Sequence, residues 1–307
     1  MKKLSVLVLV ALVLSLGFFA PATAEEAEEA TPGLKITVLV DNNALIGKML
    51  LSEPALSMIL QDGDKTILFD TGYSDAALKN AHALGFDLTE VDAIALSHGH
   101  FDHTVGLFYL MKEMRDRKID KKIDLICHPD TFLPKDNQGG FFGNVLNEPT
   151  LSEYFNITMT KEPYQLTDHL TWLGEIERNY DIEEYVPFTT VFKDGEWVDD
   201  YLIEDTAIAY TNDEGVAVIT GCSHAGICNI TDYAKKVTKQ EKVLDVIGGF
   251  HLLNPSEERM QGTIDYFLDL GVESIAPCHC VDLPSRMTLN ESIPVREVGT
   301  GTVIELP

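Results

Sequence analysis

The chain has 307 residues, 45% of them hydrophobic, and a formal net charge of -26 at pH 7. This length is enough for one large domain or two small ones. A strongly acidic chain repels nucleic acid and anionic lipid surfaces, so neither is an expected partner. We expect a small-molecule substrate instead.

Residues 1–24 have the layout of a secretory signal peptide. Lys2 and Lys3 precede an apolar run that ends at Ala20, and Ala22-Thr23-Ala24 forms an A-x-A cleavage site. The alternative is an uncleaved membrane anchor, because the run is nearly long enough to span a bilayer. We therefore expect export to the periplasm, to the extracellular medium or to the outer face of a membrane. A stable membrane partner is expected only if the signal stays uncleaved.

A short acidic linker, EEAEEATPG at 25–33, separates the predicted signal from a predicted folded domain at 34–307. Strand-like and helix-like patterns alternate along this domain, which favours an α/β fold built in layers. Strands are expected at 34–41, within 55–70 (two, around a Gly-Asp turn), 91–97, 122–129, 206–221 (a hairpin), 242–250 and 272–280, and helices at 74–84, 105–117, 225–239 and 256–271. The patterns weaken around 130–205, where we expect an insertion that shapes or covers a site.

Histidines follow four of the expected strands. They are His98, His100 and His103, grouped with Asp102 after the strand at 91–97, and then His224, His251 and His279 at three later strand ends. Because the ends of neighbouring strands in a layered α/β protein share one edge, these side chains are expected to converge on one site.

The spacing of the first group indicates two adjacent metal positions. His98 and His100 are alternate residues and should serve one position, while Asp102 and His103 should turn toward the other. His224 and His279 are the best candidates for the further ligand that each position needs. Imidazole and carboxylate groups suit one or two Zn²⁺ ions, with Mn²⁺ or Fe²⁺ also possible.

These motifs carry a family resemblance. SHGHFDH at 97–103 resembles the HxHxDH signature of the metallo-β-lactamase superfamily, and ILFDTG at 67–72 resembles the strand that precedes it there. GCSHAG at 221–226, GGFHL at 248–252 and PCHC at 277–280 resemble the subfamily of metal-dependent hydrolases that includes the dihydropterin ribofuranosyl-aminobenzene phosphate synthases. The resemblance extends over nearly all of the folded domain.

The resemblance implies an αββα sandwich with the metal site along one edge, between the two sheets. His98, His100, Asp102 and His103 match the metal-binding motif, and His224 and His279 match the further ligands. Asp70 would orient the histidine loop through hydrogen bonds. Many members of the superfamily have a bridging aspartate where this chain has Cys222, which either binds metal as a thiolate or packs nearby.

The expected function is a metal-dependent hydrolase that activates water against an ester, amide or phosphoester bond. Asp102 and His251 are the predicted catalytic residues, and Gly248-Gly249 should let the substrate approach the backbone. One alternative is a pterin-related transferase of the same subfamily; another is a non-catalytic secreted metal-binding protein. A serine hydrolase is disfavoured, because Ala225 occupies the second glycine position of a G-x-S-x-G motif around Ser223. The five cysteines do not have the spacing of a disulfide scaffold.

Overall fold

The computed structural model describes residues 33–137, 140–183 and 185–307. The predicted signal peptide and residues 25–32 of the predicted linker lie outside these ranges. In the described part of the chain, no helix is long and apolar enough to cross a membrane.

The first of two large sheets contains the amino-terminal strands. Its order is β17 (Val303–Glu305), β1 (Lys35–Val40), β2 (Ser57–Asp62), β3 (Lys65–Phe69), β4 (Ala93–Ala95), β5 (Ile123–Cys127) and β8 (Phe155–Met159). The strands from β3 to β8 are parallel. Parallel neighbours need crossover connections, and the predicted helices supply them: α1 (Ala76–Leu84) joins β3 to β4, and α2 (Phe101–Thr104) with α3 (Gly106–Arg117) joins β4 to β5.

The second sheet contains most of the carboxyl-terminal strands. Its order is β16 (Ala276–Cys278), β15 (Val243–Gly249), β14 (Gly215–Thr220), β13 (Ala207–Asn212), β10 (Leu170–Trp172) and β9 (Tyr164–Gln165). The predicted hairpin is confirmed, because β13 and β14 pair from Asn212 opposite Gly215. Helices α5 (Ile227–Thr238) and α6 (Glu257–Leu270) connect the parallel strands β14, β15 and β16, and α7 (Leu283–Asn290) follows β16.

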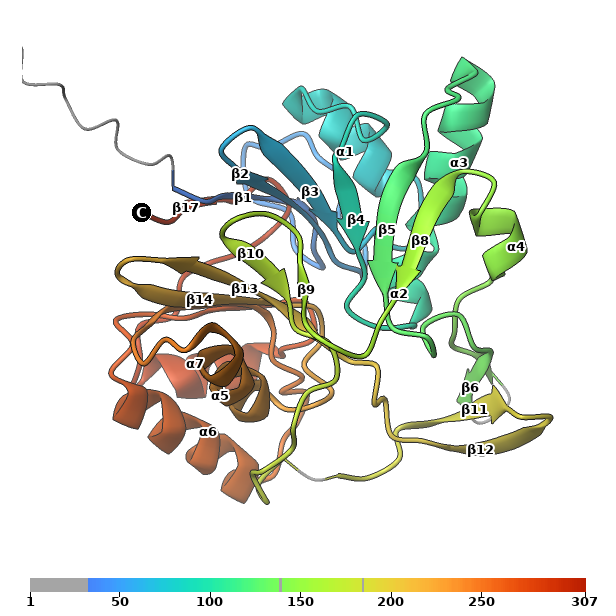
Figure 1. The fold of residues 1–307 in the computed structure, drawn as a ribbon. Helices are drawn as coiled ribbons and strands as arrows, with labels where there is room; N and C mark the ends of the chain where they lie inside the picture. The colour runs from blue at the N-terminus through green and yellow to red at the C-terminus, as the bar shows by residue number, and fades with distance from the viewer. Residues whose placement is uncertain (1–32, 138–139, 184) are drawn as a thin grey trace, which may run out of the picture. The chain divides into compact units, whose positions relative to one another are not determined.

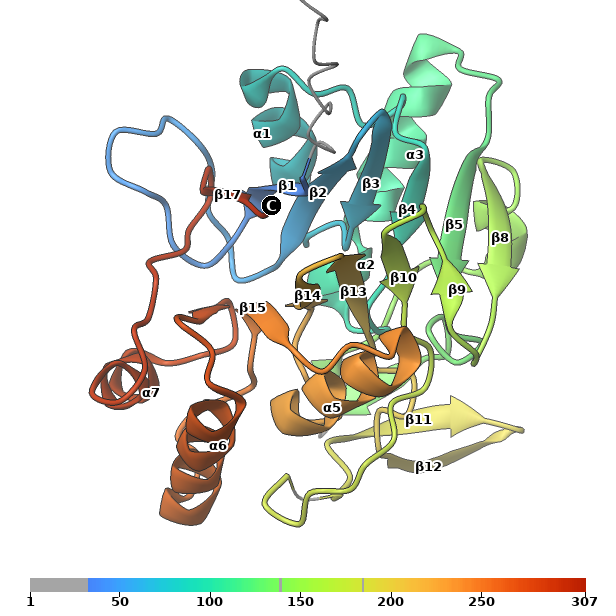
Figure 2. The same cartoon turned by 60° about the vertical axis from the view of Figure 1, so that its left-hand side comes forward.

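Three apolar layers hold these elements together. Figures 1 and 2 show the arrangement of the sheets and helices from two sides. The central layer lies between the sheets and includes the fully buried Trp172, whose indole nitrogen donates to the Leu96 carbonyl at 2.9 Å. A second layer packs α1 and α3 on the outer face of the first sheet. A third packs α5 and α6 on the outer face of the second sheet. The predicted αββα sandwich is therefore confirmed.

The stretch around 130–205 contributes strands to all three sheets. It contains β8, β9 and β10 of the large sheets, the short helix α4 (Glu148–Leu151), and a smaller sheet of order β12 (Glu196–Asp200), β11 (Thr189–Lys193), β6 (Lys135–Asn137) and β7 (Gly140–Phe141). The small sheet lies beyond the ends of the large ones (Figure 1). Buried Lys135 anchors it, with its Nζ 2.6 Å from Asp200 and 2.8 Å from Glu204. That this stretch is an insertion stays a prediction.

Candidate metal centre

The six side chains predicted as metal ligands lie together where strands from both large sheets end. His98 and His100 follow β4, and Asp102 and His103 belong to the short helix α2. His224 follows β14 and His279 follows β16 in the other sheet. His98 Nε2 lies 3.0 Å from His100 Nδ1, and the His98 and His224 ring centroids are 4.8 Å apart.

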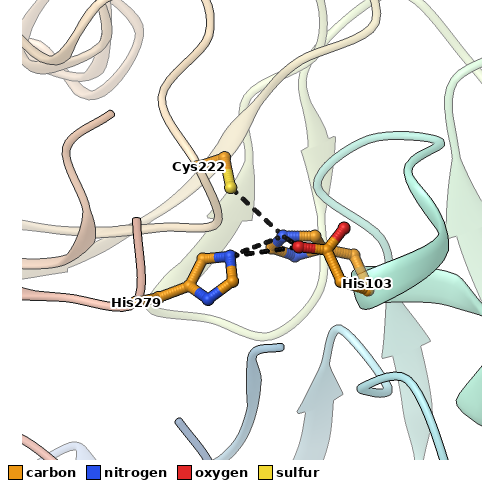
Figure 3. A group of neighbouring side chains, drawn as sticks. His103, Cys222 and His279 are labelled. Carbon is orange, nitrogen blue, oxygen red and sulfur yellow. Dashed lines mark hydrogen bonds and ion pairs between the residues drawn. The ribbon is translucent and has the colours of Figure 1, made fainter. Parts of the chain in front are cut away.

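One group of four residues draws its ligand atoms into a small volume. The donor atoms of Asp102, His103, Cys222 and His279 all lie within 4.8 Å of one another. His103 Nε2 is 3.2 Å from both Cys222 Sγ and His279 Nε2, and Asp102 Oδ2 is 3.4 Å from His279 Nε2. Figure 3 shows the labelled side chains pointing toward one another.

In each of the two imidazoles of this group, Nδ1 lies within hydrogen-bonding distance of a side-chain oxygen. Asp70 Oδ2 is 2.7 Å from His103 Nδ1, and Asn42 Oδ1 is 2.9 Å from His279 Nδ1. Asp70 also accepts hydrogen bonds from the backbone nitrogen and hydroxyl of Ser97 at 2.8 and 2.7 Å, so it fixes the start of the histidine loop. The hydrogen bonds predicted between Asp70 and the histidine loop are therefore present. Such partners set the tautomer and leave each Nε2 free to face a metal ion.

A second group lies beside the first and shares one residue with it. His98, Cys222 and His224 also have ligand atoms within 4.8 Å of one another, so Cys222 Sγ belongs to both groups. His100 adjoins this second group, with its ring centroid 4.8 Å from that of His224. The side chains therefore form two neighbouring clusters with Cys222 between them.

The electrostatics of the histidines suit cation binding. Burial lowers the pKa of His98, His100 and His224 well below the ordinary value, so each presents a neutral imidazole with a lone pair. Burial acts the same way on His103, but the carboxylates of Asp102 and Asp70 outweigh it and raise its pKa.

The pKa values of Asp102 and Asp205, two carboxyl groups beside the histidines, are shifted in opposite directions. Burial opposes ionisation of Asp102, yet His103 and His279 hold its pKa below the usual range, so it is an anion. Burial raises the pKa of Asp205 to about 7. Asp205 lies behind the second group, where its Oδ1 is 3.9 Å from His98 Nδ1 and its Oδ2 accepts from the Ala225 backbone nitrogen.

A divalent metal ion fits this donor set. Two nitrogens bound to one tetrahedral zinc lie about 3.3 Å apart, close to the separation of the His103 and His279 nitrogens. Among the described residues, several buried polar atoms of the centre have no hydrogen-bond partner: His100 Nε2, Asp102 Oδ1, Asp205 Oδ1 and His224 Nε2. A bound cation would give such atoms a partner.

His251, the second predicted catalytic residue, lies beside the centre, with its ring 4.4 Å from that of His224. It borders a cavity of about 170 Å³ together with Phe188 and Arg259. Burial lowers the pKa of His251 to about 4, and the nearby Arg259 adds to this effect.

The role predicted for Gly248 and Gly249 is wrong. A Cβ on Gly248 would lie 2.0 Å from the Thr220 carbonyl oxygen, and one on Gly249 would lie 2.4 Å from that of Gly221. Both residues are buried. These glycines therefore let β15 approach the end of β14 closely, rather than letting a substrate approach the backbone.

Some residues of the site were missed by the sequence reasoning. Asp41 and Asn42 directly follow β1, and they bind the backbone and the ring of His279. The strand-end rule that found the histidines would have found them too. Phe188 and Arg259 carry no local signal, because only the folding of distant segments places them beside the histidines. All five cysteines are buried free thiols.

Comparisons with known proteins agree with this geometry. The family model of the metallo-beta-lactamase superfamily matches residues 53–119. The 7,8-dihydropterin-6-methyl-4-(beta-D-ribofuranosyl)-aminobenzene-5'-phosphate synthase of Methanocaldococcus jannaschii is 33% identical over 261 residues, which cover 80% of this chain and 87% of that protein. An uncharacterized protein of the same organism, MJ0448, is 31% identical over 83% of this chain and 94% of its own length.

Among solved structures, the crystal structure of Tm1679, described as a metal-dependent hydrolase of the beta-lactamase superfamily, has a TM-score of 0.76 and 28% identity. The match covers 89% of this chain and 99% of that one. Fold, clustered side chains and relatives thus agree, and this chain belongs to the metallo-β-lactamase superfamily, in the subfamily that resembles the dihydropterin ribofuranosyl-aminobenzene phosphate synthases.

Proposed function

We propose that this protein is a metal-dependent hydrolase that cleaves an ester, amide or phosphoester bond with one or two divalent ions. The observation that carries the proposal is the buried double cluster, in which the ligand atoms of each group lie within 4.8 Å of one another and several nitrogen and carboxylate atoms have no hydrogen-bond partner among the described residues. The similarity to a metal-dependent hydrolase over 89% of this chain supports it.

We assign His98, His100 and His224 to one metal position and Asp102, His103 and His279 to the other. Cys222 stands between them, and its sulfur is 3.2 Å from His103 Nε2. We propose that Cys222 serves as a shared thiolate ligand in place of a bridging carboxylate. Zinc suits this mixture of nitrogen, sulfur and carboxylate donors best, although Mn²⁺ or Fe²⁺ also fits the nitrogen and oxygen ligands.

When bound, such ions lower the pKa of water and polarise the carbonyl or phosphoryl oxygen under attack. The residues of the chain position the reactants. Asp102 is an anion with one unpartnered oxygen, so it can accept a hydrogen bond from the attacking water. His251 borders the cavity as a neutral imidazole, so it can donate a hydrogen bond to a substrate oxygen. The apolar layer between the sheets excludes bulk water from behind the site.

A pterin-related transfer reaction is the second candidate. The observation in its favour is the identity of 33% with a relative named as a dihydropterin synthase. Both reactions would use the same cluster, and they differ in the group that attacks the substrate.

Metal analysis of the purified protein, paired with a substrate screen, tests the proposal. We expect one or two divalent ions per chain, and hydrolysis of a lactone, lactam, thioester or phosphodiester that chelator abolishes and zinc or manganese restores. His98→Ala should abolish turnover, whereas His169→Ala, which removes a histidine paired with Asp62, should not. Hydrolysis that survives His98→Ala would refute the assignment, and metal binding without turnover on any substrate would favour a binding protein.

We also propose that the protein acts outside the cytoplasm, on the strength of the charged start, apolar run and A-x-A triplet of residues 1–24. Amino-terminal sequencing of the protein recovered from its host tests this. A mature chain that begins near Glu25 is expected, and an intact Met1 in the soluble cytoplasmic fraction would contradict it.

A further inference from the structure

The lining of the cavity beside the candidate metal centre includes histidines, apolar side chains and one arginine. His224, a candidate metal ligand, and His251 line this cavity. The apolar side chains of Val186, Phe188 and Leu202 line it too, with the Phe188 ring 5.0 Å from that of His224 and 5.3 Å from that of His251. Arg259, in the first turn of α6, also lines the cavity.

Arg259 has a guanidinium group without a partner. Its Nε is buried, and among the described residues its side chain forms no hydrogen bond or ion pair. Arg117 and Arg296, by contrast, form ion pairs through their terminal nitrogens, with Asp87 and Asp245 respectively. Leaving a partly buried cation without a hydrogen-bond partner is costly, and an anionic ligand in the cavity would supply that partner.

The acidic side chain of the same cavity does not neutralise this charge by direct contact. Glu183 is buried, and its two oxygens accept hydrogen bonds from the backbone nitrogens of Cys228 and Asn229 at 2.8 and 2.9 Å. Its hydrogen-bonding capacity is thus directed at the start of α5 and not at Arg259. Arg259 and Glu183 still attract each other through space, but in the described part of the chain the guanidinium group has no hydrogen bond or ion pair, although the chain as a whole has a net charge of -26.

We propose that Arg259 binds an oxyanion of the substrate, a carboxylate or a phosphate, while Phe188 packs against the apolar part next to it. The guanidinium has the fork of donors that matches either group. This inference rests on the proposed function, because it makes the anionic group a second point of attachment beside the bond that is cleaved. It narrows the substrate class to compounds with an anionic substituent close to the scissile bond.

Anion binding can be measured without turnover. Inorganic phosphate and acetate are titrated by calorimetry into the full-length protein as purified, and into the variants Arg259→Gln and Arg259→Lys. Arg286→Gln is the matched control, since Arg286 also has a buried, unpartnered Nε but does not line the cavity. We expect Arg259→Gln to weaken binding by about tenfold or more, the loss of a charge-assisted hydrogen bond, with Arg259→Lys in between and Arg286→Gln unchanged.

The anion that binds more tightly, phosphate or acetate, shows which oxyanion of the substrate Arg259 would bind. No anion binding by the wild type overturns the inference, as does equal binding by the wild type and Arg259→Gln. An equal loss in Arg259→Gln and Arg286→Gln also overturns it, because it indicates a general charge effect. A thermal melt of each variant reveals a folding defect, and Arg259→Lys then carries the comparison. A protein that binds anions through Arg259 but holds no metal would refute the proposed function and leave this site standing.

Discussion

Replacing Asp70 with asparagine tests how strongly the metal cluster depends on the groups behind it. The Asp70 carboxylate is fully buried and lies within 2.8 Å of three groups: the backbone nitrogen and hydroxyl of Ser97, and Nδ1 of His103. Asparagine has nearly the same shape, and it tolerates the left-handed backbone found here, with φ of 54°. However, it offers one acceptor oxygen instead of two. Either Ser97 or His103 then loses the acceptor for its N–H group.

The expected loss follows from that count. A hydrogen bond to a charged acceptor contributes about 1.5–3 kcal/mol, and loss of a carboxylate behind a metal-binding histidine weakens metal affinity by about 10- to 100-fold. We therefore expect Asp70→Asn to bind zinc about 10- to 100-fold more weakly, measured by competition with a chromogenic chelator.

Asp62→Asn is the matched control, because Asp62 is a buried carboxylate whose Oδ1 is 3.0 Å from Nδ1 of His169, a histidine outside the cluster. It should keep the metal affinity of the wild type. Unfolding of the metal-free proteins in urea separates a loss of stability from a loss of affinity. Zinc affinity unchanged in Asp70→Asn, or lowered equally in both variants, would refute the reasoning.

Two further substitutions test the site and the core. With cobalt in place of zinc, the wild type should show the near-ultraviolet absorbance of a thiolate bound to cobalt, and Cys222→Ser should lose it. The control Cys280→Ser, which changes a neighbouring buried thiol, should keep this absorbance. If Cys222→Ser keeps the band, Cys222 only packs nearby. Trp172→Phe should lower the free energy of unfolding in urea by about 2–4 kcal/mol, because it leaves a space between the sheets and frees the buried Leu96 carbonyl. Trp197→Phe, at a residue 52% exposed, should change it by less than about 0.5 kcal/mol, and similar losses in both variants would contradict this explanation.

The local patterns of the chain predicted most of the elements correctly. The helix expected at 256–271 is α6 at Glu257–Leu270, and the hairpin expected at 206–221 is β13 and β14. These elements can be recognised because apolar residues recur with a period of 3.6 residues in helices and 2 residues in strands, and because turn residues such as Gly215 lie between them. The histidines were found for the same reason, because each follows a recognisable strand.

The tertiary structure decided which side chains at the strand ends lie next to one another. Cys222 lies between two clusters because β14 in one sheet ends opposite β4 in the other. Gly248 and Gly249 looked like an opening for a substrate, yet the carbonyl oxygens of Thr220 and Gly221 occupy that space. Such contacts join residues that are far apart in the chain, and no periodicity records them.

The sequence by itself therefore determined the layers and the chemistry of the candidate metal ligands, since both follow from residue type and local spacing. Only the folded chain decided which ligands share a cluster, which carboxylates and amides orient them, and that Arg259 faces the same cavity as His251. The physical reason is that side-chain periodicity specifies which face of an element is buried, whereas the packing of one sheet on the other specifies what that face meets.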